Sequence, residues 1–396
     1  MDLPLPSDTM AERLSWFAKM RAGEPVCHDN GEDVWHVFRH ADVARVLTDS
    51  AAFSSDIREF LPPPEFATSF NNKGNFLLMD PPEHRQMRGL VSQAFTPRLV
   101  AGLAPRIAEV TAQLLDSVAD RERFDIVDTV TIPLPVIIIA ELLGLPSEDH
   151  RLFRQWGEVL IESGFEAEPS AESTARTAPT LKDMETYLLD QVRLRRGEPG
   201  DDILSGLIAV ERNGERLDDE GIVGFATLLL ISGHITTTSL LGNAVQCLDE
   251  HPEAADELRN SPELLPTAVE EVLRYRSPFT TADRLTTAEV ELGGRTIPPG
   301  ARVCGWLHSS NRDESVFTSP DVFDIRRQPN PHLGFGRGAH FCIGAPLARL
   351  EGEIALRELL SRYRRIRVER DAPLPYFSPG SNIHAAKQLP VRVATA

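Results

Sequence analysis

The sequence is poor in cysteine and in positive charge, and it lacks long apolar runs. Its four cysteines form no CxxC pair, which excludes a four-cysteine zinc ribbon and fits a reducing cytoplasm better than a disulfide framework. A net charge of −18, from 41 basic and 59 acidic residues, argues against general nucleic-acid binding. The most apolar stretches, 132–145 and 225–231, fall short of the roughly 18–20 uninterrupted apolar residues that cross a bilayer. We therefore expect a soluble, cytoplasmic protein that binds neither nucleic acid nor membrane.

The rest of the composition is that of an ordinary folded protein, with 41% apolar, 7% aromatic and 25% charged residues. The length of 396 residues would allow two or three domains, but no stretch divides the chain into parts of distinct composition. We expect one domain over residues 1–396. The N-terminus lacks a basic region followed by an apolar one, so no signal peptide is expected.

Helical periodicity dominates from Arg98 to Arg276, and strand signals are few and short. The predicted fold class is therefore mainly α with small β-sheets near both chain ends (α+β). A continuous helical pattern follows Pro97, and another helix is expected at Ala345–Tyr363. The expected strands are Val34–Phe38, Val290–Leu292, Ala301–Gly305 and Leu389–Val393.

A long helix is predicted between an acidic cap at Asp218 and the pair His251-Pro252. Acidic side chains accept hydrogen bonds from free N–H groups at a helix start, and proline cannot continue a helix. Shorter helices follow at Glu253–Arg259 and Glu263–Arg276. Two long loops are expected at Ile57–Asn75 and Glu166–Ala178. Such loops are often lids or binding segments, although plain surface disorder explains the second equally well.

One cysteine, Cys342, stands where a reactive thiolate is favoured. Gly336 and Gly338 precede it, and Gly338 can adopt a positive φ at little cost. A helix begins just after the cysteine, and its dipole and free N–H groups are expected to lower the pKa of the thiol. These are the conditions for a cysteinate metal ligand.

The segment Phe335–Gly344 has the order F-G-x-G-x-H-x-C-x-G. It resembles the haem-binding signature of the cytochrome P-450 (haem-thiolate) family. The resemblance implies that haem b lies between the long oxygen-side helix and the cysteine-bearing helix. It assigns Cys342 as the iron ligand, Phe335 as its packing neighbour, and Gly336 and Gly344 as further cofactor-binding positions.

Other segments match the family in the expected order. Glu271 and Arg274 form an ExxR pair 71 residues before the cysteine, and the resemblance places a later arginine in their buried network. Arg327 fits that place by spacing, with Arg326 as the alternative. These residues are expected to be structural.

The resemblance also implies that four side chains hold the haem propionates. His84 and Arg88 lie one turn apart on the face of an expected helix, as two donors to one carboxylate would. Arg284 and His340 are the other two. The alternative is a helix with solvated charges.

On the oxygen side, Ser232-Gly233-His234-Ile235-Thr236 matches the family's bend in the long helix. Thr236 corresponds to the alcohol that hydrogen-bonds dioxygen, Gly233 to the residue that makes room for it, and Ser232 lies on the same face. The alternative for this face is plain core packing. Ile235 replaces the family's usual acid, so we hypothesise that protons arrive through ordered water with Thr236 or through a substrate hydroxyl. His234 points away from Thr236 and is a weaker proton donor.

The resemblance implies a monooxygenase that receives NAD(P)H electrons through a ferredoxin or flavodoxin and its reductase. Arg85, Arg337 and Arg349 form a candidate docking patch, although scattered solubilising charge explains them equally well. The protein is expected to be a monomer.

By family position, the substrate pocket is expected to include segments 57–78, 160–186, 278–281 and 381–383, together with Thr236. The individual pocket residues expected are Leu228, Ile231, Ser232, Phe279, Thr280, Asn382 and Ile383.

By analogy with macrolide tailoring enzymes, the substrate is expected to be a bulky, mostly apolar polyketide-type metabolite that is hydroxylated or epoxidised. A terpenoid, steroid or fatty-acid-like substrate is the alternative. A haem-thiolate protein that binds or senses gas without turnover is another.

Overall fold

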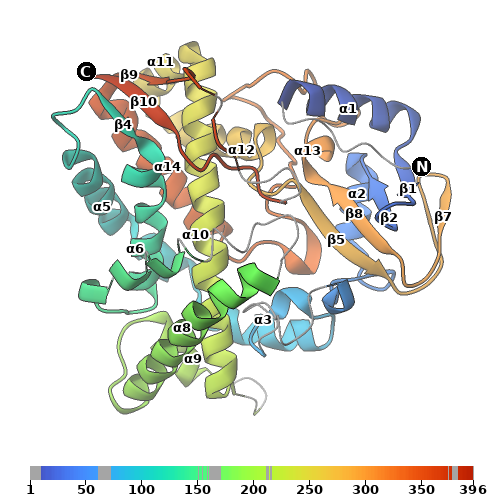
Figure 1. The fold of residues 1–396 in the computed structure, drawn as a ribbon, viewed down its shortest axis with the longest axis horizontal. Helices are drawn as coiled ribbons and strands as arrows, with labels where there is room; N and C mark the ends of the chain where they lie inside the picture. Colours follow the sequence, from blue (N-terminus) through green and yellow to red (C-terminus); the bar gives the residue numbers. More distant parts are fainter. Residues whose placement is uncertain are drawn as a thin grey trace.

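The computed structural model describes residues 10–60, 73–149, 151–153, 155–157, 159, 171–210, 214, 216–372, 374–376 and 382–395. Its helices surround one long central helix, α10 (Figure 1). The helices are α1 Met10–Gly23, α2 His40–Thr48, α3 Glu83–Ala94, α4 Pro97–Gly102, α5 Ala104–Asp116, α6 Pro133–Leu142, α8 Ala171–Gly197, α9 Ile203–Ala209, α10 Asp219–Glu250, α11 Pro252–Asn260, α12 Leu265–Tyr275, α13 Leu307–Ser310 and α14 Ala345–Arg362.

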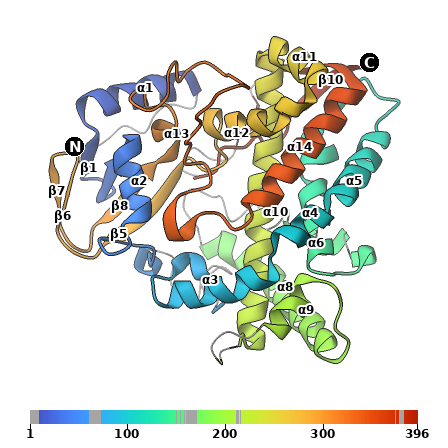
Figure 2. The ribbon, with the colours of Figure 1, turned by 180° about the vertical axis from the view of Figure 1, so that it is seen from behind.

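The helix α10 has the ends that the sequence predicted. The side chain of Asp218 accepts a hydrogen bond from the backbone N–H of Gly221, and the helix stops before Pro252. The helix packs against α6, α8 and α14, and Figure 2 shows α14 lying along it on the reverse face. The helix α10 is long and apolar enough to cross a membrane, which the sequence analysis did not anticipate. Its most apolar 18 residues are, however, 83% buried inside the protein, as in the core helix of a folded domain.

The strands form three small sheets. A five-stranded sheet has the order β1-β2-β8-β5-β3, in which β2 and β8 are parallel and the other neighbours antiparallel. Its strands are β1 Val26–Asp29, β2 Val34–Val37, β3 Phe53–Ser54, β5 Thr281–Thr286 and β8 Arg302–Trp306. The other two sheets are β4-β10-β9 and β6-β7, built from β4 Arg123–Asp125, β6 Val290–Leu292, β7 Arg295–Ile297, β9 Tyr363–Val368 and β10 Pro390–Thr395.

The sheets match the prediction only in part, because the strands β1, β3, β4, β5, β7 and β9 were not predicted. All four predicted strands are present, as β2, β6, β8 and β10. The largest sheet is not confined to one chain end, however, because it joins the N-terminal strands to β5 and β8. β5 escaped prediction because its sequence, TADRLT, lacks a clear apolar alternation.

Two helical boundaries also differ from the prediction. The continuous pattern after Pro97 is divided into α4 and α5 at Leu103, just before Pro105. The predicted loop 166–178 is helical from Ala171 onward, because the alanines, glutamates and arginine of this stretch are good helix formers. Residues 61–72 and 160–170, which include most of the first predicted loop, lie outside the described residues.

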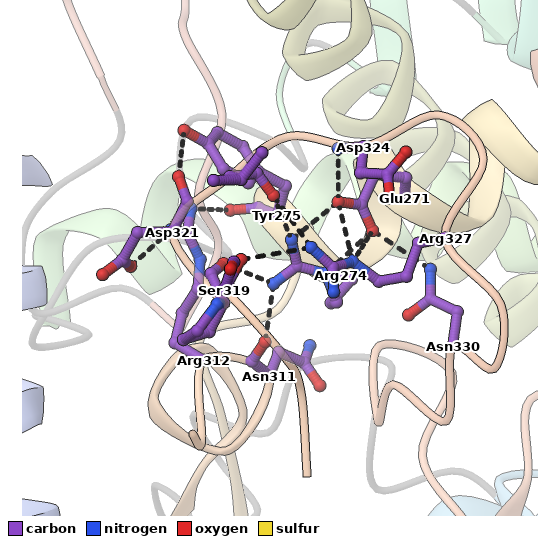
Figure 3. Close-up of polar contacts among 12 residues, drawn as sticks. Glu271, Arg274, Tyr275, Asn311, Arg312, Ser319, Asp321, Asp324, Arg327 and Asn330 are labelled. Atoms are coloured by element: carbon purple, nitrogen blue, oxygen red, sulfur yellow. Dashed lines mark hydrogen bonds and ion pairs between the residues drawn. The ribbon is translucent and has the colours of Figure 1, made fainter. Parts of the chain in front are cut away.

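A buried charge network ties α12 to the chain that leads to the cysteine (Figure 3). The guanidinium of Arg274 donates to the Glu271 carboxylate at 2.7 Å, and both side chains are fully buried. Arg327 lies against the same carboxylate, with its Nε 3.1 Å from Oε2. Arg326, the alternative from sequence, instead pairs with Glu257 at the surface. One carboxylate therefore holds two cations and anchors residues 311–330.

This arrangement makes neighbouring arginines unequal. Removing Arg327 leaves the buried Glu271 with one cation fewer and is expected to cost about 3–5 kcal/mol of stability. Arg326→Ala removes only an exposed pair and is expected to cost less than about 1 kcal/mol. Urea unfolding of Arg327→Ala and Arg326→Ala measures the difference, and equal losses would contradict the network's role.

Candidate functional site

The loop that carries Cys342 is held by backbone geometry. Gly336 and Gly338 have φ angles of 69° and 76°, in the left-handed region that favours glycine. A Cβ on Gly338 would lie only 3.2 Å from the carbonyl oxygen of Leu47 in α2. The Cys342 N–H donates to the Phe335 carbonyl at 2.9 Å, which closes the loop directly before α14. The glycines thus allow the cysteine loop to lie against α2.

The Cys342 thiol does not have the lowered pKa that the helix-dipole argument predicted. Burial raises the pKa of the thiol above its ordinary value, and this outweighs the opposing effects of the Gly344 and Ala345 N–H groups and of two nearby arginines. The prediction was wrong because it omitted desolvation. A bound metal cation would stabilise the thiolate directly.

Four cationic or hydrogen-bonding side chains meet beside this loop. His84 and Arg88 come from α3, Arg284 from β5 and His340 from the loop itself. The His84 and His340 rings are 3.9 Å apart, and the Nε2 atom of each is buried without a partner among the described residues. Arg88 donates to the Phe341 carbonyl at 2.6 Å, so it braces the cysteine loop as well.

The electrostatics of this cluster favour the binding of an anion. Burial lowers the pKa of His340 to about 3, and the positive charges nearby add to this effect. Burial also lowers the pKa of His84, and the charge of Arg88 lowers it further. Burial also lowers the pKa of Arg88 and of Arg284. Carboxylates placed here would satisfy both histidines and offset the repulsion between the cations. The residues present therefore fit a haem, whose propionates supply two carboxylates and whose iron takes a thiolate.

The central helix α10 carries the predicted oxygen-side residues. The Thr236 hydroxyl is half-buried and donates to the Ser232 carbonyl at 2.7 Å. Gly233 lies close to α6, because the position of a Cβ there would be only 2.3 Å from Cδ1 of Ile139. The glycine permits close packing of two helices.

The predicted pocket residues are only partly brought together. Ile231, Phe279 and Ile383 pack in one apolar cluster with Ile235 and Ala385. The Thr280 N–H donates to the Asn382 carbonyl at 2.8 Å, but the Asn382 side chain is exposed. Leu228 packs in the main core instead. The pocket residues assigned to 61–72, 160–170 and 381 lie outside the described residues.

The family model described as Cytochrome P450 matches residues 189–388. The chain is 46% identical over 360 residues to the erythromycin C-12 hydroxylase of Saccharopolyspora erythraea, covering 90% of this chain and 89% of that protein. It is 43% identical to the cyclomarin C epoxidase CymV of Salinispora arenicola, covering 92% of both chains. The open structure of cytochrome P450 Eryk from S. erythraea aligns with a TM-score of 0.91 and 44% identity, over 100% of this chain and 99% of that one.

The chain belongs to the cytochrome P450 family. The predicted fold class is confirmed, and the protein is a haem-iron monooxygenase, an oxidoreductase that receives electrons from redox partners and acts on a small molecule. The relatives named above come from bacteria. Nothing in the comparisons favours the gas-binding alternative.

His234 of this P450 points away from Thr236, as the helical spacing predicted. Its ring lies against Gly157, where a Cβ would be 2.8 Å from the ring. Together with Ile139 and Trp156 it lines a cavity of about 20 Å³. Burial lowers the pKa of His234 to about 4, so the ring is neutral at physiological pH. A neutral ring on this side is not placed to donate protons to Thr236.

Sequence reasoning missed Glu351 on α14. This glutamate is fully buried, its Oε2 atom has no partner among the described residues, and burial raises its pKa to about 8. The sequence spacing could have shown that this glutamate is buried. Leu347, Glu351 and Ala355 fall four residues apart and so share the buried face of the helix.

The propionate role of the histidine pair predicts a change in haem retention. His84→Phe keeps the ring volume but removes the donor, so haem loss to a scavenging apoglobin should become about tenfold faster. Gln93→Ala, a change on the exposed part of α3, should leave the rate unchanged. Equal rates for the two variants would contradict the assignment.

Proposed function

We propose that this P450 hydroxylates or epoxidises a bulky, mostly apolar secondary metabolite of the polyketide macrolide type, in antibiotic biosynthesis. The observation that carries the proposal is the apolar cluster of Ile231, Ile235, Phe279, Ile383 and Ala385 next to Thr236 on α10. Apolar side chains at a binding site favour apolar ligands, and a few polar groups orient them. The name of the erythromycin C-12 hydroxylase supports the macrolide substrate class and hydroxylation, and that of the cyclomarin C epoxidase supports epoxidation.

The proposed cofactor residues act on one haem. Cys342 ligates the iron, and Phe335, Gly336 and Gly344 shape its loop. The proposed propionate ligands are His84, Arg88, Arg284 and His340. When bound, the haem supplies the binding and reductive activation of dioxygen.

Around Thr236 on α10, the chain has to manage protons and exclude bulk water. In our proposal the Thr236 hydroxyl holds a proton at Oγ1, and the apolar cluster keeps the reacting carbon of the substrate dry. Ile235 cannot donate a proton, so ordered water or a substrate hydroxyl supplies the protons to Thr236. Glu271, Arg274 and Arg327 are assigned a structural role because both arginines pair with the one buried Glu271 carboxylate.

The proposed electron donor is a ferredoxin or flavodoxin with its NAD(P)H-dependent reductase. Arg85 and Arg337 are exposed and remain in the proposed docking patch. Arg349 is a weaker member, because its guanidinium donates to the Glu270 carboxylate at 2.6 and 2.9 Å. Burial would raise the pKa of Glu270, but Arg349 and His332 outweigh it and lower the pKa to about 2.

We further propose that residues 1–396 form one domain and that the protein is a cytoplasmic monomer.

Turnover under ¹⁸O₂ tests this proposal. The purified protein, a surrogate ferredoxin and reductase, and NADPH are incubated with a macrolactone, a steroid, a terpenoid and a fatty acid, and products are analysed by mass spectrometry. We expect one ¹⁸O atom in the macrolactone product and the best turnover with that compound. Thr236→Ala should lower product per NADPH about tenfold, because proton supply then fails.

Omission of the reductase is the control and should abolish the product. Better turnover of the steroid, terpenoid or fatty acid would replace the substrate class. Absence of ¹⁸O from every product would contradict oxygenation by this protein.

A further inference from the structure

A stripe of polar side chains runs along α10 from the oxygen-side residues to the protein surface. The side chains are spaced alternately four and three residues apart, so at about 100° per residue they fall within an arc of about 80° and extend over about 27 Å. The stripe consists of Ser232, Thr236, Ser239, Asn243, Gln246 and Glu250. Most other side chains of this helix are apolar and buried. A continuous polar face on a core helix requires partners along its whole length.

The middle of the stripe is bonded to segments that also line the proposed substrate pocket. The Ser239 hydroxyl donates to the His384 carbonyl at 2.6 Å. The Asn243 Nδ2 atom donates to the carbonyls of His384 and Arg276 at 3.1 and 3.0 Å. The Gln246 Oε1 atom accepts a hydrogen bond from the Tyr376 hydroxyl, and the Tyr376 ring stacks on His384. Polar groups from three parts of the chain therefore surround the stripe.

Several of these groups are left unsatisfied. Five buried side-chain atoms in this region have no partner among the described residues: Asn243 Oδ1, Gln246 Nε2, Arg276 Nε, Ser277 Oγ and His384 Nε2. Each such atom would cost about 1–3 kcal/mol if it stayed dry. The set contains both donors and acceptors, and buried water typically makes about three hydrogen bonds to groups of this kind. Bound water would satisfy the whole set.

The two ends of the stripe have different surroundings. At the outer end Glu250 is solvent-exposed and pairs with Arg276 and Arg370. At the inner end lies the Thr236 hydroxyl. Between them, a backbone bridge pairs Phe279 with Ile383, whose side chains belong to the apolar cluster. The neighbouring His384 is buried within the polar region and its pKa is lowered well below the ordinary value by burial, so its ring is neutral.

We propose that the polar stripe of α10, with Ser277 and His384 facing it, holds a file of ordered water molecules that conducts protons from the surface at Glu250 to Thr236. The proposal rests on the role of Thr236 given above. It explains how a P450 with isoleucine at position 235 obtains protons. Insertion of one oxygen atom of dioxygen and release of the other as water consumes two electrons, which the redox partner provides, and two protons. Each proton enters from bulk water, each hydroxyl or water accepts one proton as it gives one, and no side chain changes its net charge.

Two neighbouring hydroxyls on α10 give a matched test. Ser239→Ala removes a stripe hydroxyl, and Thr238→Val removes a buried hydroxyl that lies off the stripe and donates to the Thr131 carbonyl at 2.8 Å. We expect Ser239→Ala and Gln246→Met to lower product per NADPH several-fold, to raise peroxide release and to increase the solvent isotope effect in D₂O. Thr238→Val should match the unmodified protein in all three.

A crystal structure of the unmodified haem-loaded protein gives an independent readout. We expect ordered water bonded to Asn243 Oδ1 and His384 Nε2. The absence of ordered water at these atoms would overturn the proposal, and this readout does not depend on whether a variant folds. If Ser239→Ala formed as much product per NADPH as the unmodified protein while Thr236→Ala formed much less, the water file would be overturned but the role of Thr236 would stand. An unchanged yield of product per NADPH in Thr236→Ala would instead overturn the proposed function of that residue.

Discussion

The burial of the Cys342 thiol is the constraint on which the rest of the site depends. Burial raises the pKa of this thiol, so its charge is tolerated only beside a cation. We propose that the iron of a haem provides that cation, and the cysteine loop must then be rigid enough to present the sulfur. The left-handed glycines, the contact of Gly338 with α2 and the bond from Arg88 to the Phe341 carbonyl supply this rigidity. The Glu271 network fixes the chain that leads into the loop.

The distribution of charge follows from the same cofactor. The protein carries a net charge of −18, yet the space beside His84 and His340 collects cations and unsatisfied donors. This is costly without a ligand, because burial and mutual repulsion lower the pKa of both histidines. The polar stripe of α10 holds a second set of unsatisfied atoms. We propose that the haem carboxylates bind the donors beside His84 and His340, and that ordered water binds the atoms along the stripe.

Much of this architecture could be predicted from the sequence, where a local signal decided the structure. Asp218 and Pro252 bounded α10 correctly, and the spacing from Glu271 to Arg327 identified the arginine that lies against the glutamate. Features that depend on tertiary packing could not be predicted. The pairing of β5 with β8 depends on partners distant in sequence, and the contact of Gly233 with Ile139 depends on how α6 crosses α10. The raised pKa of Cys342 depends on burial, which no motif reveals.

The central claim is that Cys342 ligates the haem iron as a thiolate, and the absorption spectrum of the reduced protein under carbon monoxide tests it most directly. The account predicts a strongly red-shifted, thiolate-type Soret band for the unmodified protein and its loss in Cys342→Ser. A globin-like band in the unmodified protein, or a thiolate-type band that persists in Cys342→Ser, would contradict the account.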